Sequence, residues 1–338
     1  MTIAEAALPA SRIRTPGFDI RFILAPMALA LLSAAVVLAA PRLFPFVLIA
    51  DLWLLSYPHV AATFTRLCFD RESFERYHLL VTVLPFFVLI GVAGLGFTGC
   101  AWLAMSVYFY WQWFHYTRQS WGIAKTYRRG LTPRPQEEWA ELLAFALVPV
   151  WGLLQRSARA PETLLGFEIR LLPVPQLLAD MVGIAAALAL AWWILDRAIA
   201  WREGRLQPLH TLYVASHHVM FALGYGVIVS TDLGWLTLNI WHNLQYLSFV
   251  WLANHRRFED RPGTEAAFLA RLSRSGSGAR YALVCIGFAG TAYLALQNIV
   301  WLLPAAAILY QTINFHHYIV DAIIWRRAKG PGRRSASA

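Results

Sequence analysis

The sequence predicts an all-α, polytopic integral membrane protein, a single bundle of about ten transmembrane helices. Three observations support this fold class. Hydrophobic residues occupy 58% of the 338 positions and charged residues only 14%, which is unusual for a water-soluble domain. The apolar residues are grouped into runs of about 20, the length that spans a bilayer as a helix. The lysines and arginines, which give a net charge of +10, are concentrated between those runs.

Ten runs qualify as transmembrane helices, and proline marks two of the breaks between them, at Pro41 and Pro304. In chain order the runs cover residues 20–40, 43–65, 78–97, 102–126, 139–154, 177–201, 209–230, 233–254, 281–299 and 302–325. The fifth run is short, which is typical of a tilted or re-entrant segment. The first run is long enough to span and no A-x-A-like cleavage site follows it, so we expect it to remain as a helix.

The distribution of basic residues predicts the orientation of these helices. With both termini cytoplasmic, 24 lysines and arginines fall in cytoplasmic segments, 4 fall in outside loops, and Arg118 lies within a run. This asymmetry is what the positive-inside rule requires. We therefore expect a cytoplasmic tail over residues 1–19, one transmembrane domain over 20–326, and a disordered basic tail over 327–338. The abundance of arginine over lysine favours a bacterial protein, and hence a bacterial inner membrane.

Several classes of function are disfavoured by what the sequence lacks. The basic residues are explained by topology, so we expect no nucleic-acid partner. Lys125 stands at the cytoplasmic end of the run 102–126 and no lysine lies deeper within a span, so no lysine is placed to form a retinal Schiff base. Neither a GxxxxGK[ST] nor a GxGxxG loop opens a helix, so nucleotide chemistry has no evident site.

Histidine is the most informative residue type. Of ten histidines, His78, His210 and His255 are expected at the cytoplasmic rim, and seven lie within five of the runs: His59, His115, His217, His218, His242, His316 and His317. At 1.5 Å per residue, four runs place these imidazoles about 10 to 15 Å from the cytoplasmic edge, and the fifth places His242 at about 21 Å. A single membrane histidine often only bonds helices together. A shared depth predicts instead a metal or cofactor site for which all seven are candidate ligands, and the choice within each histidine pair stays open.

Other polar residues share helix faces with the histidines. The spacing i, i+4, i+7, i+11 joins three sets on one face each: Tyr108, Gln112, His115 and Gln119; Trp235, Asn239, His242 and Tyr246; and Tyr310, Asn314, His317 and Asp321. We expect Asp321 to orient the imidazole of His317, which lies one turn earlier on the same run, and Gln119, Asn239 and Asn314 to act likewise around the cofactor. Tyr116, Tyr246 and Asp321 are the candidate proton-transfer residues. Asp51 is expected to be a ligand or a partner for Arg118.

The composition of this layer indicates which cofactor it would hold. Several imidazoles with few acidic neighbours suit iron(II) or copper better than magnesium or calcium. Iron is therefore expected, with copper or haem as alternatives. An aromatic run from Tyr108 to Tyr116 reaches the middle of a span. It is typical either of helix packing and a thick interfacial belt or of a tunnel for a long apolar substrate such as a polyene or acyl chain.

The order of these motifs resembles a known family. Pro58-His59, the aromatic-flanked His115, Trp241-His242-Asn243-Leu244 and a final histidine pair are similar, in short patches, to the Brp/Blh-type bacterial carotenoid dioxygenases. That resemblance implies a membrane enzyme that cleaves a carotenoid with O₂ and non-haem iron. It implies iron ligands at His59, His115 and His242, completed by His217, His218, His316 or His317. In this chain Val60 follows His59 where the family has glycine.

The leading hypothesis is thus an iron-dependent oxygenase acting on an apolar, lipid-like substrate, and three alternatives stay open. A di-iron hydroxylase or desaturase is second among enzymes, although its HxxxH box is missing and Val214 and Ile313 stand where its HxxHH boxes need histidine. A haem-binding membrane protein would use two histidines from facing helices. A proton-coupled transporter would use the histidines with Asp51 and Asp321 as a relay. A dioxygenase would need no redox partner, whereas a hydroxylase would.

Overall fold

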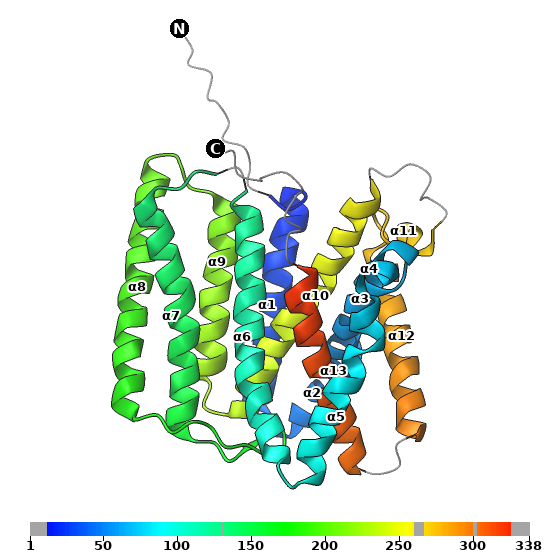
Figure 1. Ribbon diagram of the computed structural model, residues 1–338. Helices are drawn as coiled ribbons and strands as arrows, with labels where there is room; N and C mark the ends of the chain where they lie inside the picture. The colour runs from blue at the N-terminus through cyan, green and yellow to red at the C-terminus, as the bar shows by residue number, and fades with distance from the viewer. Residues whose placement is uncertain (1–11, 130, 260–266, 300–302, 326–338) are drawn as a thin grey trace, which may run out of the picture.

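The structure is a computed structural model that describes residues 12–129, 131–259, 267–299 and 303–325. These residues form a bundle of long helices with one short β-hairpin (Figure 1). The elements are α1 (Pro16–Ala39), the 3₁₀ turn η1 (Pro41–Leu43), α2 (Phe44–Asp51), the π-helical turn η2 (Leu52–Ser56), α3 (Tyr57–Leu67), α4 (Arg71–Thr82), α5 (Leu84–Phe97), α6 (Ala101–Tyr127), α7 (Pro135–Arg159), β1 (Thr163–Leu164), β2 (Phe167–Glu168), α8 (Gln176–Arg202), α9 (Pro208–Phe221), the π-helical turn η3 (Ala222–Val227), α10 (Thr231–Glu259), α11 (Phe268–Leu272), α12 (Gly278–Ile299) and α13 (Leu303–Ile324).

Most of each predicted run is helical over the residues that the structure describes, but the run 78–97 is divided between α4 and α5 at Val83, and residues 228–230 lie beyond η3 in non-helical conformation. Five stretches are long and apolar enough to cross a membrane: Pro16–Ala39, Pro41–Leu67, Arg71–Phe97, Gln176–Arg202 and Gly278–Ala295. Their outward faces are apolar; Phe86, Phe87 and Ile90 of α5 are 65%, 69% and 69% exposed. Such a surface suits contact with lipid and would be costly in water.

The remaining long helices are less apolar because they carry polar side chains toward the interior. α10 buries Asn239, His242, Asn243 and Gln245 among its apolar residues, and α6 buries Gln112 and His115. Polar groups inside a membrane protein gather where helices face one another rather than lipid. The lower hydropathy of these helices therefore reflects an internal polar layer.

Helix α10 runs through the centre of the bundle. It packs against α1, α3 and η3, while α13 packs against α3, α5 and α6. The two largest apolar clusters meet along α10, where Trp235 and Trp241 are 1% exposed. Helix α3 thus has both α10 and α13 as neighbours, and α13 also contacts α6 (Figure 1).

The first helix begins earlier than expected. Thr15 accepts a hydrogen bond from the backbone N–H of Phe18 at 3.3 Å, and Pro16 occupies the first helical position. A threonine cap followed by proline is a strong helix start, so α1 takes in residues assigned to the N-terminal tail. Residues 1–11 of that tail and the predicted C-terminal tail, 327–338, lie outside the described residues.

Arg156 is not in an exposed outside loop, as the charge pattern suggested, but is 1% exposed at the end of α7. Its guanidinium donates to the carbonyl oxygens of Gly224 at 2.9 Å and Val229 at 2.6 Å, and also to that of Ile228. These carbonyls belong to η3 and the two residues that follow Val227. A helix end buried without such partners would be costly, so this arginine has a structural role.

Candidate metal site

Four histidines from four different helices converge at the centre of the bundle. His59 of α3, His115 of α6, His242 of α10 and His317 of α13 each offer a ring nitrogen, and these nitrogens all lie within 4.8 Å of one another. Their side chains are buried, with exposures of 1 to 4%. We refer to His59, His115, His242 and His317 as the four-histidine cluster.

Hydrogen bonds fix two of the rings. His59 Nδ1 donates to the carbonyl oxygen of Ser56 at 3.0 Å, so in the neutral ring Nε2 is unprotonated and its lone pair is available to a metal. His317 Nδ1 is bonded to Thr63 Oγ1 at 2.9 Å. The two Nε2 atoms then face each other at 2.9 Å. Two nitrogens each about 2.1 Å from one ion and at right angles would lie about 3 Å apart, so this pair has the spacing of neighbouring ligands.

The other two rings present unpaired nitrogens. His115 Nε2 and His242 Nε2 are buried and have no hydrogen-bond partner among the described residues. Buried polar atoms are nearly always bonded, and an orphan calls for a specific reason. A cation held by the cluster would satisfy both atoms. The residues present therefore fit a histidine-bound transition metal.

Asp321 and Thr63 hold the cluster from outside. Asp321 Oδ2 lies 3.6 Å from His115 Nδ1, and Asp321 Oδ1 accepts a hydrogen bond from Trp325 Nε1 at 2.5 Å. Thr63 Oγ1, besides contacting His317, is 2.9 Å from the hydroxyl of Tyr246. The expected position of Asp321 next to a ligating ring is found, but its ring is that of His115 rather than His317.

Aromatic rings enclose the cluster. Tyr116 stacks on His242 with centroids 3.9 Å apart, and Tyr318 stacks on His115 at 4.6 Å. Tyr246 meets His59 edge-on at 5.1 Å. Tyr116 and Tyr246, both expected at the site, are thus in contact with it. Part of the aromatic run of α6 is packed inside the bundle, whereas Phe114 is 52% exposed on its outer side.

A polar network on the Asp51 side supports Tyr116. The Tyr116 hydroxyl donates to Asn239 Oδ1 at 2.5 Å, and Asn239 Nδ2 donates to Asp51 Oδ2 at 2.5 Å. Asp51 is therefore not a partner of Arg118, whose guanidinium donates to the carbonyl oxygen of Ala322 at 2.9 Å. Asn239 reaches the cluster only through Tyr116.

Three of the seven predicted ligands lie apart from the cluster. His316 Nε2 donates to the carbonyl oxygen of Leu80 at 2.7 Å. His217 stacks on Phe145 at 3.6 Å and contacts Ser120 Oγ at 3.0 Å, and His218 meets Trp193 at 5.0 Å. Successive residues of an α-helix point about 100° apart, so only one member of a pair can face a given centre. The pair on α9 is directed toward α6, α7 and α8 instead.

Two of the predicted orienting residues are also placed differently. Asn314 Nδ2 donates to the carbonyl oxygen of Tyr310 one turn earlier at 3.1 Å. Gln119 lines a cavity that Asp321 also lines and whose lining includes none of the four histidines. Sequence reasoning missed Ser56 and Thr63. Both stand at helical spacing from His59, at i−3 and i+4, so periodicity alone was sufficient to suggest them.

Comparison of the chain with protein-family models, with curated proteins and with solved structures gives no match. The site is therefore interpreted from its own geometry and chemistry.

Proposed function

We propose that the protein is a membrane-embedded non-haem iron oxygenase that acts on a long apolar substrate. The observation that carries this proposal is the convergence of four buried imidazoles whose nitrogens lie within 4.8 Å. A metal centre made only of neutral imidazoles, without thiolate or a directly converging carboxylate, suits iron(II) or copper. The order of the histidine motifs, which resembles the carotenoid dioxygenases, favours iron and a polyene substrate. Iron held there would supply the redox chemistry for reaction with O₂.

The geometry favours one ion over two metals or a haem. Ligand atoms that all fall within 4.8 Å surround a single position, whereas a di-iron centre places its ions about 3.5 to 4 Å apart and needs more ligands. The ring centroids of His59, His115 and His242 lie 5.0 to 5.3 Å from a neighbour in the cluster, which leaves no room for a macrocycle. A mononuclear centre is accordingly the form that these residues support best.

The chain's own residues would orient the ligands and exclude water. The Ser56 carbonyl and Thr63 hydroxyl direct Nε2 of His59 and His317 inward, and Asp321 does the same for His115 through the longer 3.6 Å contact. Tyr246 carries an exchangeable proton on its hydroxyl, which is hydrogen-bonded to Thr63 Oγ1. Thr63 Oγ1 in turn contacts His317, so one hydroxyl group links Tyr246 to the cluster. Tyr116 carries a second, bonded to Asn239. These are the groups that we assign to proton delivery.

We further propose ten transmembrane spans with both termini in the cytoplasm of a bacterium. The support is the arginine and lysine asymmetry together with the even number of helical runs. Cysteine-labelling of the chain in sealed vesicles tests this orientation. In a variant whose three native cysteines, Cys68, Cys100 and Cys285, are replaced by serine, a cysteine in place of Arg202 should be labelled only from the cytoplasmic side. Labelling from the opposite side would refute the topology.

The consecutive residues His316 and His317 allow a closely matched test of the metal site. We expect purified protein to contain about one iron per chain by mass spectrometry, without a Soret band. His317→Gln should lose the metal, while His316→Gln should retain it because this side chain contacts Leu80 and not the cluster. Oxygen consumption with β-carotene and with an acyl-chain substrate then distinguishes substrate classes. Absence of any transition metal, or equal iron in both variants, would refute the proposal.

A further inference from the structure

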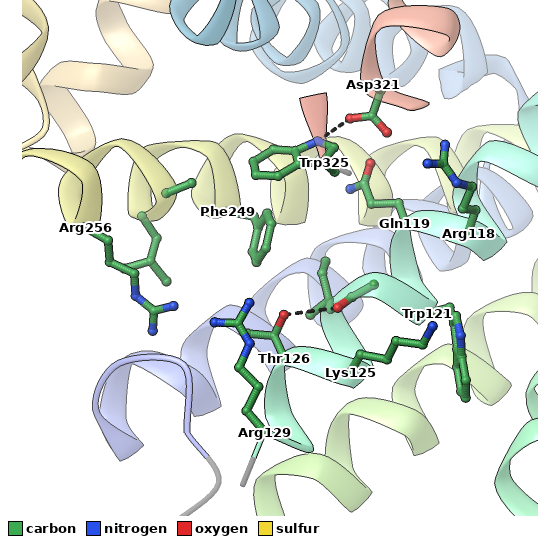
Figure 2. A pocket seen from close by; sticks show the side chains of 14 residues that line it. Arg118, Gln119, Trp121, Lys125, Thr126, Arg129, Phe249, Arg256, Asp321 and Trp325 are labelled. Carbon is green, nitrogen blue, oxygen red and sulfur yellow. Dashed lines mark hydrogen bonds between the residues drawn. The ribbon is translucent and has the colours of Figure 1, made fainter. Parts of the chain in front are cut away.

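A cavity of about 710 Å³ lies beside the four-histidine cluster, between α6, α10 and the end of α13. Its walls include the apolar side chains of Trp121, Phe249 and Leu252. Figure 2 shows Asp321 and Trp325 together at one side of it. Asp321 connects the cavity lining to the cluster, because it contacts Trp325 with one oxygen and approaches His115 with the other.

The charge of the cavity lining is strongly unbalanced. Asp321 is the single carboxylate in the lining. Four cationic side chains also line the cavity: Arg118, Lys125, Arg129 and Arg256. In Figure 2, Arg129, two residues beyond the end of α6, and Arg256 of α10 extend toward one another. Burial and the neighbouring Arg129 guanidinium both lower the pKa of Arg256, which Asp19 and Glu259 only partly offset. An anion between the two guanidinium groups would relieve this repulsion.

The cations are unequally engaged by the protein. Arg118 donates to Ala322, Lys125 lies over the ring of Trp121 at 5.2 Å, and Arg256 donates to the Ile13 carbonyl. Among the described residues no carboxylate forms an ion pair with Arg129, and Arg129 is exposed. Guanidinium groups bind carboxylates and phosphates through paired hydrogen bonds. Basic recesses between membrane helices on the cytoplasmic side are suited to anionic headgroups.

We propose that this cavity binds an oxyanion, a carboxylate or a phosphate, at its basic rim, with the apolar walls accepting the chain of an amphiphile that carries it. The proposal does not depend on a metal in the four-histidine cluster. The C-terminal segment of this chain is a poor occupant on charge grounds, because residues 326–338 contain five lysines and arginines and no acidic side chain.

Binding to full-length protein in detergent tests the site. We expect radiolabelled oleate to bind saturably and oleyl alcohol, which has the same chain without the charge, to compete at least tenfold less well. Arg129→Gln should weaken oleate binding about tenfold, as expected for loss of a charge-assisted hydrogen bond, and Arg129→Lys should recover part of it. Arg202→Gln, which removes an exposed charge from the end of α8, is the matched control and should bind as the unmodified protein does.

A second variant blocks the cavity without changing charge. Gly122 lines the cavity, and a Cβ there would meet nothing within 4 Å, so Gly122→Leu is expected to fold normally and to abolish oleate binding. Inorganic phosphate distinguishes the source of the oxyanion: if it displaces oleate in an Arg129-dependent way, the headgroup alone suffices. If it does not, the chain is also required. The proposal is overturned if neither oleate nor phosphate binding depends on Arg129, or if oleyl alcohol competes equally with oleate.

Discussion

Asp321 uses its two carboxylate oxygens on different partners, Trp325 and His115. An acceptor beside the non-ligating nitrogen fixes the tautomer of a metal-bound imidazole, and its loss typically lowers metal affinity 10- to 100-fold. We expect Asp321→Asn to lower iron affinity by about that factor, measured by competition with a chelator. Asp180→Asn, on α8 and bonded to Gln155 and Gln176, makes the same chemical change away from the cluster. Equal iron affinity in the two variants would show that Asp321 does not orient His115.

Thr63 joins His317 to Tyr246 through one hydroxyl. Thr63→Val keeps the side-chain shape but removes both hydrogen bonds, so the His317 ring loses its anchor. We expect the iron content of the purified variant to fall severalfold. Thr65→Val is a close control, because Thr65 is equally buried two residues later but bonds to Ala62 and Tyr281 instead. If the Thr63 variant keeps its full iron content, the Thr63 hydroxyl is not needed to hold His317 as a ligand.

At this scale the sequence predicted that buried histidines gather, but not which of the seven do so. His59, His115, His242 and His317 were all among the expected ligands, and Asp321 was expected beside one. The choice between His316 and His317 was not open to sequence reasoning, because depth in the membrane is nearly the same for neighbours. Only the rotation of α13 about its axis separates them, and that rotation is set by packing against α3, α5 and α6.

At the scale of elements, the contact between η3 and the start of α10 allows no added volume. A Cβ on Gly234 would overlap the Gly224 carbonyl oxygen and the Arg156 guanidinium. Overpacking at such a point typically costs about 1 to 3 kcal/mol. We expect Gly234→Ala to lower the free energy of unfolding by that amount in mixed-micelle denaturation. Gly91→Ala on α5, where a Cβ meets nothing within 4 Å, should be neutral or slightly stabilising.

The helices themselves were predictable and their ends were not. Apolar runs of about 20 residues have few alternatives to helix in a membrane, because every backbone polar group must be bonded internally. The buried position of Arg156, in contrast, depends on carbonyls of η3 about 70 residues later in the chain. A charge count treats every arginine near an apolar run as exposed, so it assigned this one to a loop.

At the scale of the whole molecule, an ion pair ties the connection between α3 and α4 to the end of α10. Arg257 donates two hydrogen bonds of 2.8 Å to the carboxylate of Asp70. Burial alone would raise the pKa of Asp70, but hydrogen bonds from Arg257 and Ser73 lower it below the usual 3.8. Because the folded-state pKa is the lower one, this stabilisation is complete above pH 3.8 and is lost as the pH falls through the folded-state value.

We therefore expect Asp70→Asn to be less stable than the unmodified protein near neutral pH and to converge with it in acid. Thermal unfolding in detergent across the acidic range measures this difference. As a control, Glu75→Gln removes the ion pair between Glu75, which is 61% exposed, and Arg71, which is 91% exposed. Such exposed pairs contribute little to stability. A stability difference between the Asp70 variant and the unmodified protein that stays constant with pH would contradict the ion pair.

The π-helical turn η2 contains one residue more than a regular α-helix would need between Asp51 and His59. Asp51 and His59 are eight residues apart, yet both contact α10, through Asn239 and His242 respectively. In a regular α-helix eight residues would turn the second side chain about 80° from the first, whereas seven would bring it almost into line. The turn absorbs the extra residue.

A chain lacking Leu54, which is 54% exposed, should therefore form an unbroken helix and still bind iron. A chain lacking Val60 should lose iron binding, because the spacing of His59 and Thr63 changes. Segment 52–56 would then be a place where this protein tolerates a one-residue deletion.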